Sequence, residues 1–179
     1  MTRSKVWDYS RLKKPRPYGA TTTYQLALNW LKTCPLIEDW GCGSGYFGTL
    51  LPETITYRGL DGSTSPWGSP SEVSLTAYTS QVPGILIRHV LEHNWAWETI
   101  LKNALTSFTQ RLCLILFVPV IDGEQVVNRA EHGGIPDLAL PRGRLVPMLS
   151  PYLKDLEILR TRSQYRSESL YCLERPCEM

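Results

Sequence analysis

IEDWGCGSGYFG, the stretch from Ile37 to Gly48, is the most informative part of the sequence, because an apolar segment there ends in an acidic residue and three alternating glycines follow. Glycine allows positive φ and places no Cβ between a turn and a ligand, so a nucleoside can lie against the backbone. Gly41 and Gly43 are the positions at which we expect the closest approach. Sixteen residues beyond Gly45, the sequence YRGLD places Asp61 at the end of a second apolar segment. A carboxylate at that position can accept hydrogen bonds from both hydroxyls of a ribose.

The segments around this stretch predict a sheet of seven strands. The fifth of them is apolar at nearly every position, as expected of a central parallel strand that is buried on both faces. Helices are predicted over residues 21–33, after a threonine cap, and over 95–108, where apolar residues recur on one face. A strand, a helix and another strand in succession imply a right-handed crossover in a parallel sheet. The seven predicted strands are Leu36–Trp40, Thr56–Leu60, Glu72–Leu75, Gly84–Arg88, Leu112–Val118, Leu156–Thr161 and Ser167–Leu173.

We therefore expect a Rossmann-like α/β domain with a mostly parallel seven-stranded sheet. Its helices are trimmed, because the connections after the second and third strands are too short for full helices. A further helix is predicted over residues 144–153, although prolines at 147 and 151 interrupt it. The stretch 122–141 is rich in glycine and proline and too long for a simple connection, so we expect a functional loop that closes over a substrate.

The composition of the chain limits its class. With 179 residues, 42% hydrophobic and 20% charged, it has the make-up of a protein that buries a single core. The longest apolar run, Leu112–Val118, is far shorter than the roughly 18 residues that span a bilayer, and the N-terminus has no apolar signal core. We expect a cytoplasmic protein without a membrane partner. The five cysteines show no CxxC spacing, which argues against a disulfide framework and a thiolate zinc site.

Basic residues are concentrated at the N-terminus, where six lysines and arginines fall within the first sixteen residues against one acid, Asp8. We divide the chain into a basic leader, residues 1–17, and a single domain, residues 18–179. The leader is either a solvated tail or a segment that meets an anionic partner.

The chain resembles the class I methyltransferases, which use S-adenosylmethionine. Asp39 with the glycines at 41, 43 and 45 is similar to the first motif of that family, a strand ending in an acid followed by GxGxG. Asp61 resembles the second motif. The sequence ILIRHVLEHNWAWETILKNAL, from Ile85, resembles the fourth strand of the family, an LEH turn and a helix. The resemblance covers about residues 36–119, and Arg88 and His89 are unusual for the family at their position.

The resemblance implies a binding site for S-adenosylmethionine at the carboxyl ends of the strands. In this fold the exit of the fourth strand lies beside the transferred methyl group, and a carboxylate beside the first glycine suits the ammonium end of the cofactor. If the methyl acceptor carries a proton, His89 and His132 are the candidate general bases, because neutral imidazole is available near pH 7. The alternative interpretation is that both are ordinary surface histidines without a catalytic role. The residues expected at the cofactor are Tyr18, Asp39, Gly41, Cys42, Gly43, Gly45, Asp61, Gly62 and Arg88.

Three other interpretations compete with this one. Gly43, Gly45 and Gly48 also spell GxGxxG, the dinucleotide fingerprint, but Asp39 would repel a pyrophosphate at that place. A glycine turn without a ligand is the plainest alternative. His89, Glu92 and His93 spell HxxEH, a zinc-peptidase signature that requires both histidines on one helix, whereas residues 84–88 are predicted as a strand. We therefore expect no metal.

The methyl acceptor is left open by the sequence. Since no inserted cap domain and no NPPY-type motif are visible, a small molecule is favoured in an open cleft. A nucleic acid or a protein is the second choice, on account of the basic leader. A cofactor-binding partner protein without transferase activity is a third possibility.

Overall fold

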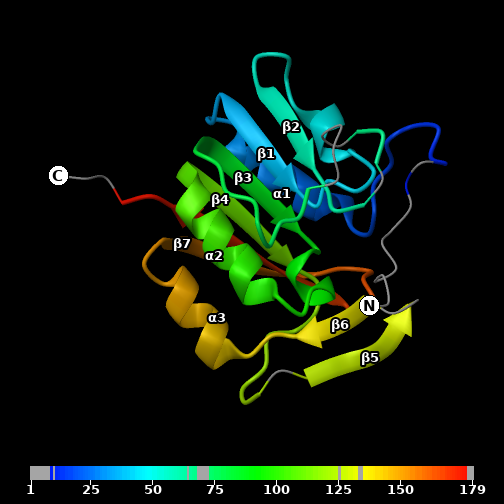
Figure 1. Ribbon diagram of the computed structural model, residues 1–179, viewed down its shortest axis with the longest axis vertical. Helices are drawn as coiled ribbons and strands as arrows, with labels where there is room; N and C mark the ends of the chain where they lie inside the picture. Colours follow the sequence, from blue (N-terminus) through cyan, green and yellow to red (C-terminus); the bar gives the residue numbers. More distant parts are fainter. Residues whose placement is uncertain are drawn as a thin grey trace.

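The computed structural model of the chain describes Tyr9 and residues 11–63, 65–67, 73–124, 126–132 and 135–176, with the backbone alone for 126–132. Its main sheet has six strands in the order β2-β1-β3-β4-β8-β7 (Figure 1). The strands from β2 to β4 are parallel, whereas β8 is antiparallel to both β4 and β7. These strands are β1 (Leu36–Trp40), β2 (Thr56–Leu60), β3 (Val82–Arg88), β4 (Phe108–Leu116), β7 (Leu153–Arg160) and β8 (Ser167–Glu174).

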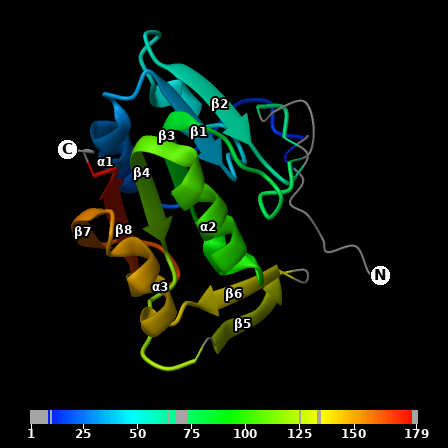
Figure 2. The ribbon, with the colours of Figure 1, turned by 60° about the vertical axis from the view of Figure 1, so that its left-hand side comes forward.

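Helices cover the two faces of the sheet, as Figures 1 and 2 show. On one face α2 and α3 pack over the strands, and on the other face α1 and the short helix η1 do so. The sheet is therefore the middle of three layers. The helices are α1 (Thr21–Leu31), η1 (Phe47–Leu50), η2 (Leu91–His93), α2 (Trp97–Ser107) and α3 (Arg142–Leu149). Within the described residues, no helix has the length and apolar character needed to cross a membrane.

The alternation of side chains along the strands explains the two cores. In β3, Ile85 and Ile87 belong to the core under α2, and Leu86 between them belongs to the core under α1. Helix α2 contributes Ile100 and Ala104, four residues apart and hence on one face. Because β3 is apolar on both sides, it can only lie in the interior of the sheet.

Two parts of the prediction are wrong: the main sheet has six strands in place of the expected seven, and two strands lie in a segment that is predicted as a loop. Residues 73–75 are not a strand, because the Val73 N–H donates to the Asp61 carbonyl (2.9 Å) and the segment folds back on the end of β2. The predicted loop 122–141 contains a second, two-stranded antiparallel sheet of β5 (Val126–His132) and β6 (Ile135–Ala139). The glycines and prolines of this stretch predict a loop, although glycines between two short segments also indicate a hairpin.

Other predicted boundaries change for identifiable reasons. No threonine caps α1, since Ala20 is the cap residue and makes no side-chain bond, while Thr23 is buried inside the helix. The glycine motif is followed by η1, a short 3-10 helix, and not by an α-helix. The predicted helix 144–153 is α3, which ends at Leu149, so that β7 begins at Leu153.

Candidate active site

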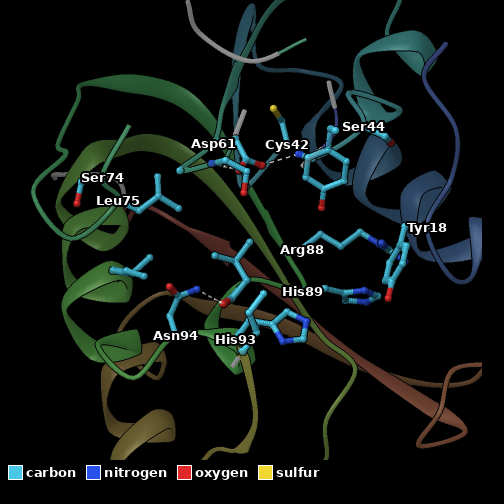
Figure 3. A pocket seen from close by; sticks show the side chains of 18 of the residues that line it. Tyr18, Cys42, Ser44, Asp61, Ser74, Leu75, Arg88, His89, His93 and Asn94 are labelled. Atoms are coloured by element: carbon cyan, nitrogen blue, oxygen red, sulfur yellow. Dashed lines mark hydrogen bonds between the residues drawn. The ribbon is translucent and has the colours of Figure 1, made fainter. Parts of the chain in front are cut away.

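A cavity of about 670 Å³ lies at the carboxyl ends of β1, β2 and β3. Its lining comes from many parts of the chain: the N-terminal segment, α1, the glycine loop after β1, residues 61–63 and 74–76 after β2, the end of β3 with η2, the start of α2, and the start of β6. Figure 3 shows these side chains around a common space. The predicted site residues that line it are Tyr18, Gly41, Cys42, Gly43, Asp61, Gly62, Arg88 and His89.

The glycine loop has the backbone geometry that the sequence requires. Gly41, Gly43 and Gly45 have φ values of 83°, 50° and 69°, a region that residues with a Cβ rarely adopt. A Cβ at Gly41 would collide with Val90, and one at Gly43 would lie 3.1 Å from the Tyr9 hydroxyl oxygen. Substitution of these glycines would therefore strain the loop and fill the space beside it.

Asp61 follows β2 directly and holds the glycine loop in place. Its Oδ2 accepts the N–H of Gly43 at 2.7 Å, and its Oδ1 accepts the N–H of Ser63 at 2.7 Å (Figure 3). Hydrogen bonds from backbone N–H groups to a carboxylate are charge-assisted and stronger than neutral ones. The carboxylate joins the ends of β1 and β2 at the wall of the cavity.

Asp39 and Gly45 lie outside the lining of the cavity. The Asp39 carboxylate is buried and accepts the hydroxyl proton of Tyr57 at 2.9 Å, and burial raises its pKa to about 7. A Cβ at Gly45 would collide with Trp67, while one at Gly48 would lie 2.7 Å from the Tyr57 ring. These positions therefore govern packing beneath the loop.

A buried charged cluster lies at the exit of β3. Glu168 of β8 accepts hydrogen bonds at Oε2 from the Thr23 hydroxyl (2.8 Å) and from Arg88 (3.4 Å), and its distance to His89 Nε2 is 3.1 Å. The Arg88 guanidinium also lies over the Tyr24 ring, 4.0 Å from its centroid. Burial lowers the pKa of His89 to about 4, so the imidazole is neutral at pH 7.

The HxxEH residues point to different partners. Glu92 is fully buried and accepts the Phe117 N–H at 2.7 Å. His93 Nδ1 lies 3.0 Å from the Pro136 carbonyl oxygen and 3.3 Å from Asp137 Oδ1. Because His89 ends a strand and η2 spans only three residues, no helix presents both histidines on one face. In the part of the chain that the structure describes, no group of three His, Cys, Asp or Glu side chains could hold a metal ion.

The N-terminal segment was predicted as a separate leader, yet part of it lines the cavity. Tyr9, Leu12 and Arg16 are among the lining residues, and the Ser44 hydroxyl donates to the Arg16 carbonyl oxygen at 2.6 Å. Residues 1–8 and 10 lie outside the described part of the chain. The basic composition of the N-terminal segment does not predict this role, because nothing in the local sequence indicates which surface the segment covers. His132 ends β5, and its side chain also lies outside the described residues.

No protein-family model and no curated protein matches the chain, but solved structures do. The 1,6-didemethyltoxoflavin-N1-methyltransferase of Burkholderia thailandensis, bound to S-adenosylhomocysteine, has a TM-score of 0.69 at 14% identity, over 86% of this chain and 76% of that one. The magnesium protoporphyrin IX methyltransferase of Synechocystis gives 0.64 at 13%, over 87% and 83%. The N-methyltransferase NodS of Bradyrhizobium japonicum gives 0.60 at 12%, over 87% and 86%. The chain therefore has the fold of the class I S-adenosylmethionine-dependent methyltransferases.

Proposed function

We propose that this chain binds S-adenosylmethionine and transfers its methyl group to a small molecule. The observation that carries the proposal is the joining of the glycine loop to Asp61 at the wall of one cavity, at the carboxyl ends of parallel strands. Open α/β sheets bind ligands at this edge. A volume of about 670 Å³ lies within the range of about 300–1,000 Å³ that is typical of small-molecule sites.

The residues at the cavity fit the parts of this cofactor. The backbone at Gly41 and Gly43 leaves room for a nucleoside, and Asp61 at the end of β2 suits the ribose hydroxyls. Leu75 and Ile100 supply apolar surface for a base on the same side of the cavity. Arg88 and Tyr18 lie at the side where we place the methionine end. We assign Asp39, Gly45, Cys42 and Gly62 to the support and shape of the loop.

The outer part of the cavity suits a flat acceptor of modest size. Tyr18 and Trp95 line the cavity with 62% and 64% of their surfaces exposed, so their rings are accessible for a flat acceptor to pack against. Three similar structures carry the names of methyltransferases, two of them named for toxoflavin and protoporphyrin substrates. A small-molecule acceptor is thus favoured over a nucleic acid or protein.

Methyl transfer places modest demands on the protein. When bound, the sulfonium cofactor supplies an electrophilic methyl group and a neutral thioether leaving group. The chain has to hold the acceptor in line with the methyl group and to exclude water. The hairpin β5–β6 lies beyond the carboxyl ends of β3 and β4 (Figures 1 and 2), and Ile135 and Pro136 of β6 line the cavity. We assign the hairpin to the acceptor side, with His132 as a second candidate base beside His89.

Titration calorimetry tests the cofactor. We expect S-adenosylmethionine and S-adenosylhomocysteine to bind with micromolar affinity, on the order of −8 kcal/mol, and NAD not to bind. Tighter binding of NAD would refute the proposal. Transfer of a tritiated methyl group into cell extract, followed by separation of the products by size, then tests the acceptor class. Label found only in macromolecules would contradict a small-molecule acceptor, and absence of label in any fraction would favour a non-catalytic partner protein.

A further inference from the structure

His89 has a backbone conformation that residues other than glycine rarely adopt. It follows β3 with φ at 56°, and its N–H donates to the Ile115 carbonyl oxygen at 3.0 Å, which fixes the bend against β4. Such a conformation is strained and persists only where its surroundings enforce it. The bend brings the imidazole to Glu168 of β8, and the ring is part of the cavity wall (Figure 3).

Glu168 determines which nitrogen of His89 carries the proton. The carboxylate is 1% exposed, and its hydrogen bonds to His89 and its neighbour Arg88 hold its pKa below the usual range against the effect of burial. It is therefore ionised at neutral pH and can only accept hydrogen bonds. A lone pair on Nε2 would face this negative charge. The neutral imidazole thus carries its proton on Nε2, and this N–H donates a hydrogen bond to Glu168.

The other nitrogen of the ring, Nδ1, then has an unused lone pair. It is buried and has no hydrogen-bond partner among the described residues, and the side chain as a whole is 7% exposed. Buried polar atoms in proteins nearly always have a partner, so an exception in a cavity wall indicates a partner that comes with a ligand. Thr23 and Arg88 bond to Oε2 of Glu168, and within the described residues neither Nδ1 of His89 nor Oε1 of Glu168 has a hydrogen-bond partner.

We propose that His89 accepts the proton of the methyl acceptor at Nδ1, with Glu168 as the residue that positions it, so that the acceptor presents a hydroxyl or an N–H group. This inference rests on the proposed function. A lone pair of the acceptor oxygen or nitrogen forms the bond to the methyl carbon, the carbon–sulfur bond breaks and its electrons remain on sulfur. The acceptor proton passes to Nδ1, and the Nε2–H bond to Glu168 is retained.

The charges around the ring suit a proton that is accepted and then released. The negative Glu168 stabilises the imidazolium, as the carboxylate does in serine hydrolase triads. Burial and the positive Arg88 oppose the imidazolium and keep the resting ring neutral, and His93 acts in the same direction. His89 touches the reacting atoms, whereas Glu168 acts through it.

The tautomer of His89 can be read without an acceptor. Nitrogen-15 NMR of histidine-labelled protein, with His89→Gln for assignment, should show the Nε2–H form at pH 7 with S-adenosylhomocysteine bound. Glu168→Ala should shift part of the population to Nδ1–H, and Glu168→Gln should restore Nε2–H because its amide oxygen still accepts. Glu174→Gln is the matched control on β8, since Glu174 pairs with Arg111 and Lys154 instead. An Nδ1–H tautomer in the wild type would overturn the inference even if the Glu168 variants fail to fold.

Methyl transfer supplies the second readout. His89→Gln and Glu168→Ala should each lower tritiated methyl transfer by about 100-fold or more, the usual effect of a general base. For His89→Gln the dissociation constant for S-adenosylhomocysteine should stay within about threefold of wild type; Glu168→Ala also removes a partner of Arg88, so its methyl transfer is compared at saturating cofactor. If the wild type does not bind S-adenosylhomocysteine, the proposed function fails. If it binds and His89→Gln transfers methyl groups at the wild-type rate, only the inference about His89 fails.

Discussion

Substitution of Asp61 by asparagine changes one atom at the junction of β1 and β2. Both carboxylate oxygens accept backbone N–H groups at 2.7 Å, from Gly43 and from Ser63. An asparagine oxygen can replace one acceptor, but its NH₂ group must then face the other N–H donor. The loss of one charge-assisted bond at a site that is only 9% exposed should lower the free energy of unfolding by about 1.5–3 kcal/mol.

The same substitution should weaken cofactor binding, because the loop and the proposed ribose contact depend on this carboxylate. A loss of about 1.5–3 kcal/mol corresponds to a dissociation constant raised roughly 10- to 150-fold. Urea unfolding and titration with S-adenosylhomocysteine measure the two effects. Asp122→Asn is the control, because the Asp122 side chain is 88% exposed and pairs with Arg142 at the surface. Wild-type stability together with wild-type affinity in Asp61→Asn would refute the role of Asp61.

Three further predictions concern the buried Glu92, Gly143 in α3 and the HxxEH residues. Burial raises the pKa of Glu92 from 4.5 to about 7, so the folded protein holds a proton there that the unfolded chain has lost, and stability falls as pH rises through this window. Glu92→Gln should therefore gain stability relative to wild type by up to about 1.4 kcal/mol per pH unit between pH 4.5 and 7; a pH-independent difference in urea unfolding would contradict this. Gly143→Ala in α3 should raise stability by roughly 0.5–1 kcal/mol, because its Cβ would meet nothing within 4 Å, and a lowered melting temperature would show a hidden contact. Treatment with a chelator should leave the melting temperature unchanged, whereas one zinc per chain in elemental analysis would revive the HxxEH interpretation.

Elements with a strong local pattern were predicted well. The bounds of β1 and β2 agree with the prediction, and the two principal helices differ from it by two residues or fewer at each end. The start of β4 was missed by four residues, because Thr109 and Gln110 are polar and exposed and do not continue the apolar run. Polar residues at the end of an apolar run can still belong to a strand, because strands pair through backbone hydrogen bonds whatever the side chains are.

Asp61 illustrates the limit of local reasoning at the site. Its position after β2 was predicted from spacing, and it was interpreted purely as a ligand for the ribose. The structure adds the bonds to Gly43 and Ser63, which make it a support of the loop as well. The position of Asp61 after β2 depends on the sequence around it, whereas its support of the glycine loop depends on the parallel pairing of β1 with β2.

The glycine loop, the acid after the second strand and the α/β fold can be predicted from the sequence, because they depend on contiguous residues whose backbone preferences are local. The contact of Glu168 with His89, 79 residues away, and the position of the N-terminal segment at the cavity are known from the tertiary structure alone. The tertiary structure also shows that Val126–His132 and Ile135–Ala139 pair as antiparallel strands. Contacts of this kind arise from the order in which strands pair and from the packing that follows, and many different sequences satisfy them equally well.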